Sequence, residues 1–142
     1  GSGILEEIDT VSRKLGIHGL VTYLGYRTAG PQLLEEYRKS DVFVIASQGS
    51  SEGFPRVLWE AMASSVPIVA TAVSSIPAFL GDVAELAEPK NVRDFTDKLR
   101  AVLSNPERRI EMIRDGRDLA KGNTLEVRGK ELADLIKKQI DA

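Results

Sequence analysis

The chain has 142 residues, of which 42% are hydrophobic and 28% are charged, and its formal net charge is −2. This composition suits one soluble domain with an ordinary core. The balanced charge excludes the concentrated basic surface of a nucleic-acid-binding protein, and every apolar run is far shorter than the roughly 20 residues of a membrane-spanning helix. With no cysteine and a single histidine, we expect no disulfide, no metal site and no cofactor.

Two helices and a short strand are predicted in the first third of the chain. Apolar positions recur at helical spacing from Ile4 to Leu15, and the pattern stops at Gly16, a residue suited to a helix end. The β-prone run 21–24 predicts a short strand. A second helical pattern begins at Pro31, whose fixed φ suits the first turn of a helix.

The middle of the chain alternates between strands and helices. Two continuous apolar runs, 42–46 and 67–71, predict strands that are buried on both faces, as in a parallel sheet covered by helices. A helix is predicted between them, from Pro55 to about Ser64, and the region 83–87 predicts a last short strand. This order predicts an α/β fold.

The region after residue 90 is predicted to be helical throughout. Apolar residues there recur at helical spacing, with breaks at Asn105-Pro106 and at Gly122-Asn123-Thr124 that divide the region into three helices. Thr124 is suited to cap the last of them. We therefore expect a parallel sheet with helices on both faces and a helical C-terminal tail.

The segment from Ser47 to Pro55 joins a predicted buried strand to a predicted helix. Ligands bind at this edge of open α/β sheets. With Pro55 in the first helical position, the backbone amides of Gly53, Phe54 and Arg56 lie near the positive end of the helix with few internal partners. The segment therefore predicts an anion site, and the missing Cβ of Gly53 would let a bound group approach the backbone closely.

Two acids accompany this segment: Glu52 lies just ahead of the helix, and Glu60 lies about one and a half turns into it. At about 100° per residue, Glu60 falls well off the centre of the apolar arc and could face a cleft. The alternative is a solvated Glu52 and an Arg56–Glu60 surface pair worth a few tenths of a kcal/mol, which the residues alone favour. The predicted apolar arc consists of Val57, Leu58, Ala61 and Met62.

Residues 52–71, EGFPRVLWEAMASSVPIVAT, are similar to the signature of the retaining GT-B glycosyltransferases of group 1, family 4 type, in which two glutamates eight positions apart frame the donor site. The runs 21–25 and 37–44 resemble the preceding elements of that family. The resemblance implies a Rossmann-like fold, half of a GT-B enzyme. Residues 4–142 would be its C-terminal nucleotide-sugar-binding domain with the front truncated, and residues 1–3 look like the remnant of a cloning tag.

The resemblance also implies a role for each matching residue. Glu52 would be the catalytic residue, contacting donor-sugar hydroxyls and organising charge around the anomeric carbon. Gly53 and Phe54 would offer backbone amides to the sugar and the diphosphate. Glu60 would accept hydrogen bonds from both ribose hydroxyls, which suits a carboxylate because an ionised acid has only acceptors.

Three further residues complete the implied site for a UDP-, GDP- or ADP-sugar. Val57 would pack on the nucleoside, and the backbone around Tyr26 would meet the base. Ser47 would assist with phosphate or, alternatively, only satisfy its own loop. The parent enzyme would be a hexosyltransferase located in the cytoplasm, soluble or peripheral at the inner membrane face.

The sequence departs from the family pattern at several positions. Ser65 stands where the family usually has the glycine that ends the helix, and Ser74-Ser75 and Ala78 replace a glycine pair and an acid. The basic pair that neutralises the diphosphate and the N-terminal acceptor domain would both precede Gly1. We therefore expect no turnover from these 142 residues alone, because group transfer needs both substrates in one cleft.

Other interpretations remain open at this stage. The chain could be a nucleotide-binding module without catalysis, or part of a sugar-nucleotide epimerase of the same fold. The two acids favour a transferase, because a binding module would not need both. An incomplete sheet would also leave an apolar edge exposed, which predicts a dimer through that edge.

Overall fold

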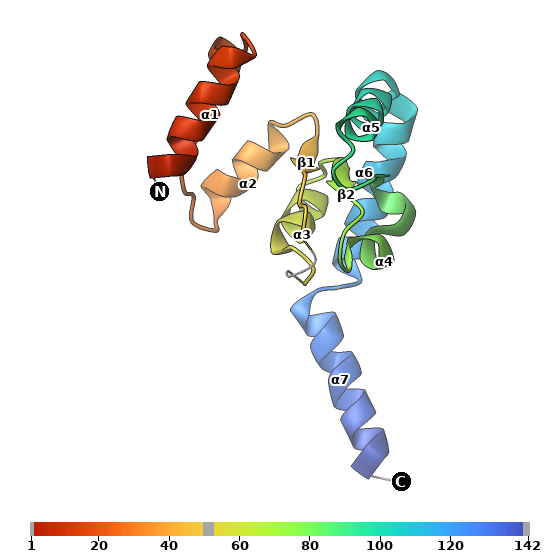
Figure 1. Ribbon diagram of the computed structural model, residues 1–142. Helices are drawn as coiled ribbons and strands as arrows, with labels where there is room; N and C mark the ends of the chain where they lie inside the picture. Colours follow the sequence, from red (N-terminus) through yellow and green to blue (C-terminus); the bar gives the residue numbers. More distant parts are fainter. Residues whose placement is uncertain (1, 50–52, 141–142) are drawn as a thin grey trace. The chain divides into compact units, whose positions relative to one another are not determined.

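The structure, a computed structural model, describes residues 2–49 and 53–140 (Figure 1). It divides into two compact units, Gly1–Leu33 and Leu34–Ala142. The first unit holds helix α1 (Ser2–Lys14) and the 3₁₀ turn η1 (His18–Leu20), and helix α2 (Pro31–Arg38) crosses the boundary. The second unit continues with β1 (Phe43–Ile45), α3 (Arg56–Ala63), β2 (Ile68–Thr71), α4 (Ile76–Leu80), the 3₁₀ turn η2 (Gly81–Val83), β3 (Glu85–Ala87), α5 (Val92–Ser104), α6 (Pro106–Lys121) and α7 (Leu125–Ile140).

Helix α1 ends where the sequence predicts. Gly16 follows it with φ of 70°, the left-handed conformation that glycine adopts without a steric penalty. The Gly16 amide donates to the Arg13 carbonyl at 3.0 Å, and the Ile17 amide donates to the Ser12 carbonyl at 2.9 Å. These two bonds form a Schellman motif, in which the residues after a helix satisfy its last carbonyls.

The strand predicted at 21–24 is wrong. The chain from 21 to 28 has no regular secondary structure, although its residues favour a β conformation. A strand exists only through hydrogen bonds to a neighbouring strand, and the sheet of the described residues consists of β1, β2 and β3 alone. β propensity without a partner therefore leaves this segment outside the sheet.

The sheet lies in the second unit and is entirely parallel, in the order β1-β2-β3. Val69 at its centre is opposite Val44 on one side and Glu85 on the other. All four residues of β2 are buried, although successive side chains point to opposite faces. Both faces of β2 are therefore covered, and the predicted α/β fold with helices on both faces is confirmed.

Helices α3 and α5 both contact β2, and α6 packs against α3 and α5. The close approach of α6 to α3 depends on Gly116, because a Cβ there would lie 3.3 Å from Met62 Cγ and 3.3 Å from Val83 Cγ1. On the α5 side, the core is a cluster of Val69, Val102 and Met112, with Val42, Phe95 and Leu99 packed against it.

The three predicted C-terminal helices are present, and each begins at a polar side chain that accepts a backbone amide. Asn91 Oδ1 accepts the Asp94 amide at 3.0 Å, and Asn105 Oδ1 accepts the Arg108 amide at 3.0 Å. Thr124 Oγ1 accepts the Val127 amide at 3.3 Å, which confirms the predicted cap. Within residues 2–49 and 53–140, no helix combines the length and the apolar character that crossing a membrane would require.

Among the residues that the structure describes, β1 pairs with β2 alone, so it lies at an edge of this sheet. Its middle residue, Val44, is exposed. An unpaired strand edge with an apolar side chain can add a strand from another chain. The dimer through this edge stays a prediction.

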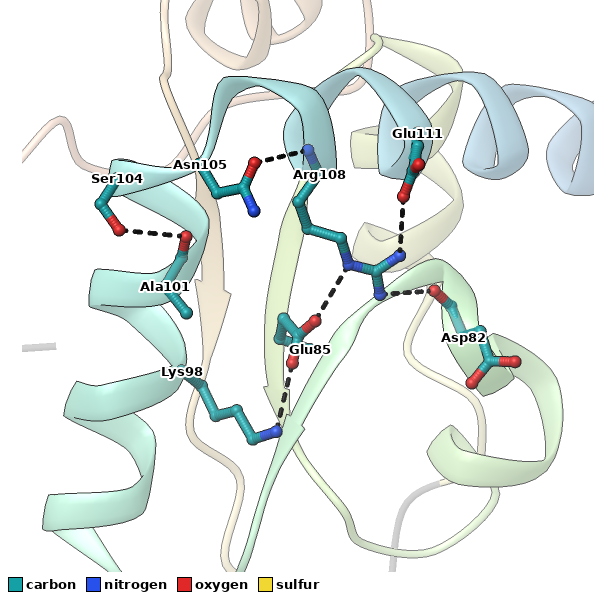
Figure 2. Close-up of polar contacts among 8 residues, drawn as sticks. All are labelled: Asp82, Glu85, Lys98, Ala101, Ser104, Asn105, Arg108 and Glu111. Atoms are coloured by element: carbon teal, nitrogen blue, oxygen red, sulfur yellow. Dashed lines mark hydrogen bonds and ion pairs between the residues drawn. The ribbon is translucent and has the colours of Figure 1, made fainter.

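One partly buried ion cluster joins β3 to the two helices that follow it (Figure 2). Glu85 lies between Lys98 of α5, at 3.2 Å, and Arg108 of α6, at 3.1 Å, and its side chain is 20% exposed. Arg108 also donates to the carbonyl of Asp82 at 2.9 Å, which ties α6 to η2. The cluster therefore links four elements through the Glu85 carboxylate and two cations.

The helix α3 ends in the same Schellman motif as α1, but with serine in the glycine position. Ser65 has φ of 65°. Its amide donates to the Met62 carbonyl at 3.1 Å, and the Val66 amide donates to the Ala61 carbonyl at 3.1 Å. Ser65 thus adopts the left-handed conformation that favours glycine, and its side chain carries the steric strain of that conformation.

We expect Ser65→Gly to raise the free energy of unfolding by about 1 kcal/mol, because glycine adopts the left-handed conformation without the steric penalty of Cβ. Chemical denaturation of both proteins measures the difference. Ser64→Gly is the matched control: Ser64 has φ of −85°, so glycine there relieves no strain and should lower stability. Equal effects of the two substitutions would contradict the prediction.

We expect Glu85→Gln to lower the free energy of unfolding by about 1–2 kcal/mol, because two partly buried cations lose their shared anion. Thermal or urea unfolding measures this change. Asp118→Asn is the control. Both side chains of the Lys121–Asp118 ion pair are 69% exposed, so this substitution should change the free energy of unfolding by less than about 0.5 kcal/mol. A Glu85 variant as stable as the parent chain would show that the cluster contributes nothing net.

Candidate functional site

The loop that carries the candidate site leaves the sheet at the carboxyl end of β1. Thr71, the last residue of β2, donates its hydroxyl to the carbonyl of Ser47 at 2.6 Å. This bond ties the start of the loop to the end of the central strand. Ser47 accepts this bond through its backbone carbonyl, and both roles that the sequence left open for Ser47 stay predictions.

Among the described residues, no side chain caps the head of α3, which is open in this sense. Pro55 caps the helix in an extended conformation, with φ of −65° and ψ of 124°, so the helix begins at Arg56, one residue later than predicted. Proline has no side-chain acceptor, and the amide of Leu58 donates to the Pro55 carbonyl at 3.1 Å. The amides of Arg56 and Val57 lie ahead of the first helical bonds, at the positive end of the helix.

Gly53 and Phe54 precede this helix end in different surroundings. Gly53 is exposed, and a Cβ built on it would meet nothing within 4 Å, so its backbone is accessible to a ligand. The Phe54 ring packs against Trp59 of α3 at 4.9 Å and against Phe79 of α4 at 5.0 Å between ring centroids. These three rings form an aromatic cluster that anchors the segment to α3 and α4.

Glu60 has a partner that the sequence did not predict. The hydroxyl of Tyr37, on α2, donates to Glu60 Oε2 at 3.0 Å, across 23 positions of sequence. Tyr37 is only 8% exposed, and its ring packs on Phe43 of β1 with centroids 5.6 Å apart. The Arg56–Glu60 surface pair does not form among the described residues, so the simpler interpretation of Glu60 is wrong.

The buried arc of α3 is narrower than predicted. Leu58, Ala61 and Met62 are buried, whereas Val57 is 36% exposed. At about 100° per residue, Val57 lies on the flank of the arc, where α3 turns away from the core. Its side chain is therefore available to pack on a ligand.

Comparison with known proteins agrees with this architecture. A sequence model of the family described as glycosyl transferases group 1 matches residues 3–119. The chain belongs to this family. A D-inositol 3-phosphate glycosyltransferase of Corynebacterium aurimucosum is 33% identical over 104 residues, which make up 72% of this chain and 24% of that protein. The chain thus spans about a quarter of the length of this curated relative.

Two solved structures show the same fold. The C-terminal domain of a glycosyl transferase group 1 family protein (LpcC) from Francisella tularensis superposes with a TM-score of 0.72 and 27% identity, over 85% of this chain and 62% of that one. Anabaena HepE in complex with UDP gives a TM-score of 0.82 at 20% identity, over 94% of this chain and 36% of that one. The fold class is therefore that of part of a GT-B glycosyltransferase.

In this member of the group 1 family, the structure brings most of the predicted site residues to one region of the second unit. Glu52 lies outside the described residues, as do Ser50 and Ser51. Tyr26 belongs to the first unit, where its side chain is exposed. The residues that come together at the carboxyl edge of the sheet and along α3 are Ser47, Gly53, Phe54, Val57 and Glu60.

Four features of this region were not predicted from the sequence. Tyr37 could have been suspected, because a tyrosine on the apolar face of a helix needs a partner for its buried hydroxyl. The Thr71–Ser47 tie and the ring of Phe79 gave no signal in the spacing of residues. A surface hollow at the same sheet edge was also missed; its lining includes Ala46, Gln48, Thr71, Glu88, Asn91 and Phe95.

Burial, reinforced by the hydrogen bond to Glu60 and the charge of that carboxylate, raises the pKa of Tyr37 from 10.0 to about 12. Because this pKa is raised in the folded chain, the neutral phenol stabilises the fold fully below pH 10, and the contribution is lost as the pH rises toward 12. Absorbance titration at alkaline pH should therefore show one phenol ionising near pH 12 that is missing from Tyr37→Phe. In Glu60→Gln this pKa should fall, because the charge is gone while burial remains. A Tyr37 that ionises with a pKa of about 10 would contradict the observed environment.

Proposed function

We propose that this chain is the donor-binding domain of a retaining glycosyltransferase, which transfers a hexosyl group from a nucleoside diphosphate sugar to an acceptor. The single observation that carries the proposal is the arrangement of α3: an open, positive helix head at the carboxyl edge of the sheet, with the held carboxylate of Glu60 further along the same helix. A diphosphate suits the first feature and a ribose diol suits the second. Membership of the group 1 family supports the same assignment.

The proposed roles follow the order of the residues along this helix. Glu52 contacts the donor sugar near its anomeric carbon, and the amides of Gly53 and Phe54 bind the sugar and diphosphate. Glu60 accepts both ribose hydroxyls, and the exposed Val57 packs on the nucleoside. Ser47 at the sheet edge assists with phosphate, and Tyr26 contributes backbone contacts to the base.

Several observations support a nucleotide as the ligand. Ligands of open parallel sheets bind outside the carboxyl ends of the strands, and the loop tied there by Thr71 leads directly into the head of α3. HepE, which has the same fold, was solved in complex with UDP. Catalysis itself we assign to a longer parent protein, in which an acceptor domain would close on this one.

We expect the 142-residue chain to bind UDP, GDP or ADP saturably, and Glu60→Ala to weaken the best of the three by about tenfold or more. The reason is the loss of hydrogen bonds to a charged acceptor, worth about 1.5–3 kcal/mol. Calorimetry measures the affinity. Trp59, the only tryptophan, lies in the aromatic cluster beside the helix head, so its fluorescence gives an independent signal.

Glu107→Ala is the matched control, since it removes an exposed glutamate from α6 with no contact to α3 among the described interactions. It should leave nucleotide affinity unchanged. Circular dichroism establishes that both variants remain folded. Equal affinities of the Glu60 and Glu107 variants, or no saturable binding of any of the three nucleotides, would reject the proposed function.

A further inference from the structure

The contact between Tyr37 and Glu60 joins a buried, well-fixed side chain to a carboxylate that the proposed function assigns to the ribose. The Tyr37 ring is held by burial and by Phe43 of the sheet, so its hydroxyl has little freedom. It donates to only one oxygen of Glu60, Oε2. Among residues 2–49 and 53–140, no other side chain donates a hydrogen bond to this carboxylate, so Oε1 keeps all of its acceptor capacity.

An ionised carboxylate has two oxygens and about four acceptor positions. One donor from the protein therefore leaves enough capacity for both hydroxyls of a ribose. Burial keeps the Tyr37 phenol neutral well above neutral pH, because its pKa is raised to about 12, so it remains a donor whenever the site works.

Glutamate has three rotatable side-chain bonds, and their freedom is lost when the carboxylate is bound in one geometry. A side chain already held by a protein hydrogen bond loses less freedom when the ligand arrives. Tyr37 is thus placed to hold Glu60 in advance of binding. Its own support comes from β1, a strand of the sheet, which makes the link rigid.

We infer that Tyr37 is a positioning residue, whose hydroxyl holds the Glu60 carboxylate so that it selects nucleotides with a ribose 2′,3′-diol. This inference rests on the proposed function, and it adds a specificity role for a residue on α2. In this role Tyr37 acts on the nucleotide only through Glu60. Its effect on binding depends entirely on Glu60. This dependence distinguishes a positioning role from a structural role in which Tyr37 only connects two helices.

The test compares the best-bound of UDP, GDP and ADP with its 2′,3′-dideoxy analogue on the full 142-residue chain. The unsubstituted 142-residue chain should bind the nucleotide with the ribose diol about tenfold or more tightly than the dideoxy analogue. Tyr37→Phe should weaken the diol nucleotide by roughly 3- to 10-fold and leave the dideoxy analogue unchanged. In a Glu60→Ala background, Tyr37→Phe should have no further effect on either ligand, because nothing remains to be positioned.

Two additional variants serve as controls for this test. Tyr23→Phe removes the hydroxyl of an exposed tyrosine of the first unit and should change neither affinity. Glu60→Asp keeps the charge but withdraws the carboxylate by one methylene from Tyr37, so it should lose the diol preference even if Tyr37→Phe does not fold.

The outcomes separate the two claims. If the parent chain prefers the diol and Tyr37→Phe keeps that preference, the positioning role is wrong and the proposed function stands. Equal losses for both ligands would show that Tyr37 has a structural role only, which also overturns the inference. If the unsubstituted chain binds neither nucleotide, or binds the two equally, the proposed role of Glu60 is wrong and so is the inference.

Discussion

The burial of β2 on both of its faces is the constraint on which the rest of this structure depends. Its four residues point alternately to two layers of helices, and all four are buried. A parallel strand in this position is fixed by packing as well as by hydrogen bonds to β1 and β3. Thr71 at its end then fixes the start of the loop after β1. The location of the candidate site is therefore set by the core.

Helix α3 connects this buried core to the residues that the proposed function assigns to ligand binding. It has only eight residues and would not be stable alone. Leu58 faces the core, while Glu60, about 160° around the helix from it, meets Tyr37 of α2. Because the helix is held on two nearly opposite sides, it cannot rotate without losing one of these contacts. The direction of the Glu60 carboxylate is thus fixed by packing that lies outside the site.

Sequence reasoning succeeded where the signal is local. The continuous apolar runs identified β1 and β2, and the capping residues located the C-terminal helices, because each pattern is set by the few residues around it. It failed at 21–24, since β propensity does not say whether a partner strand exists.

The candidate site shows the same division. The two acids and the open helix head could be predicted from the spacing of residues along one segment of the sequence. The contact of Glu60 with Tyr37 was not, because it joins residues 23 positions apart and depends on how α2 packs against α3. Val57 was wrongly predicted to be buried for a related reason. The width of the buried arc depends on the size of the surfaces that cover the helix, and the spacing of apolar residues along one helix does not give that size.

Near each end of β2, a serine holds a backbone conformation that favours glycine. Ser65, shortly before the strand, has φ of 65°, and Ser74, shortly after it, has φ of 52°. Both keep the left-handed conformation although each side chain is strained there. The turn at Ser65 is retained because Val66 is buried and its amide completes the end of α3. Because the packing around β2 dictates the path of the backbone, we expect the strain at these two serines to lower stability without changing the course of the chain beside the site.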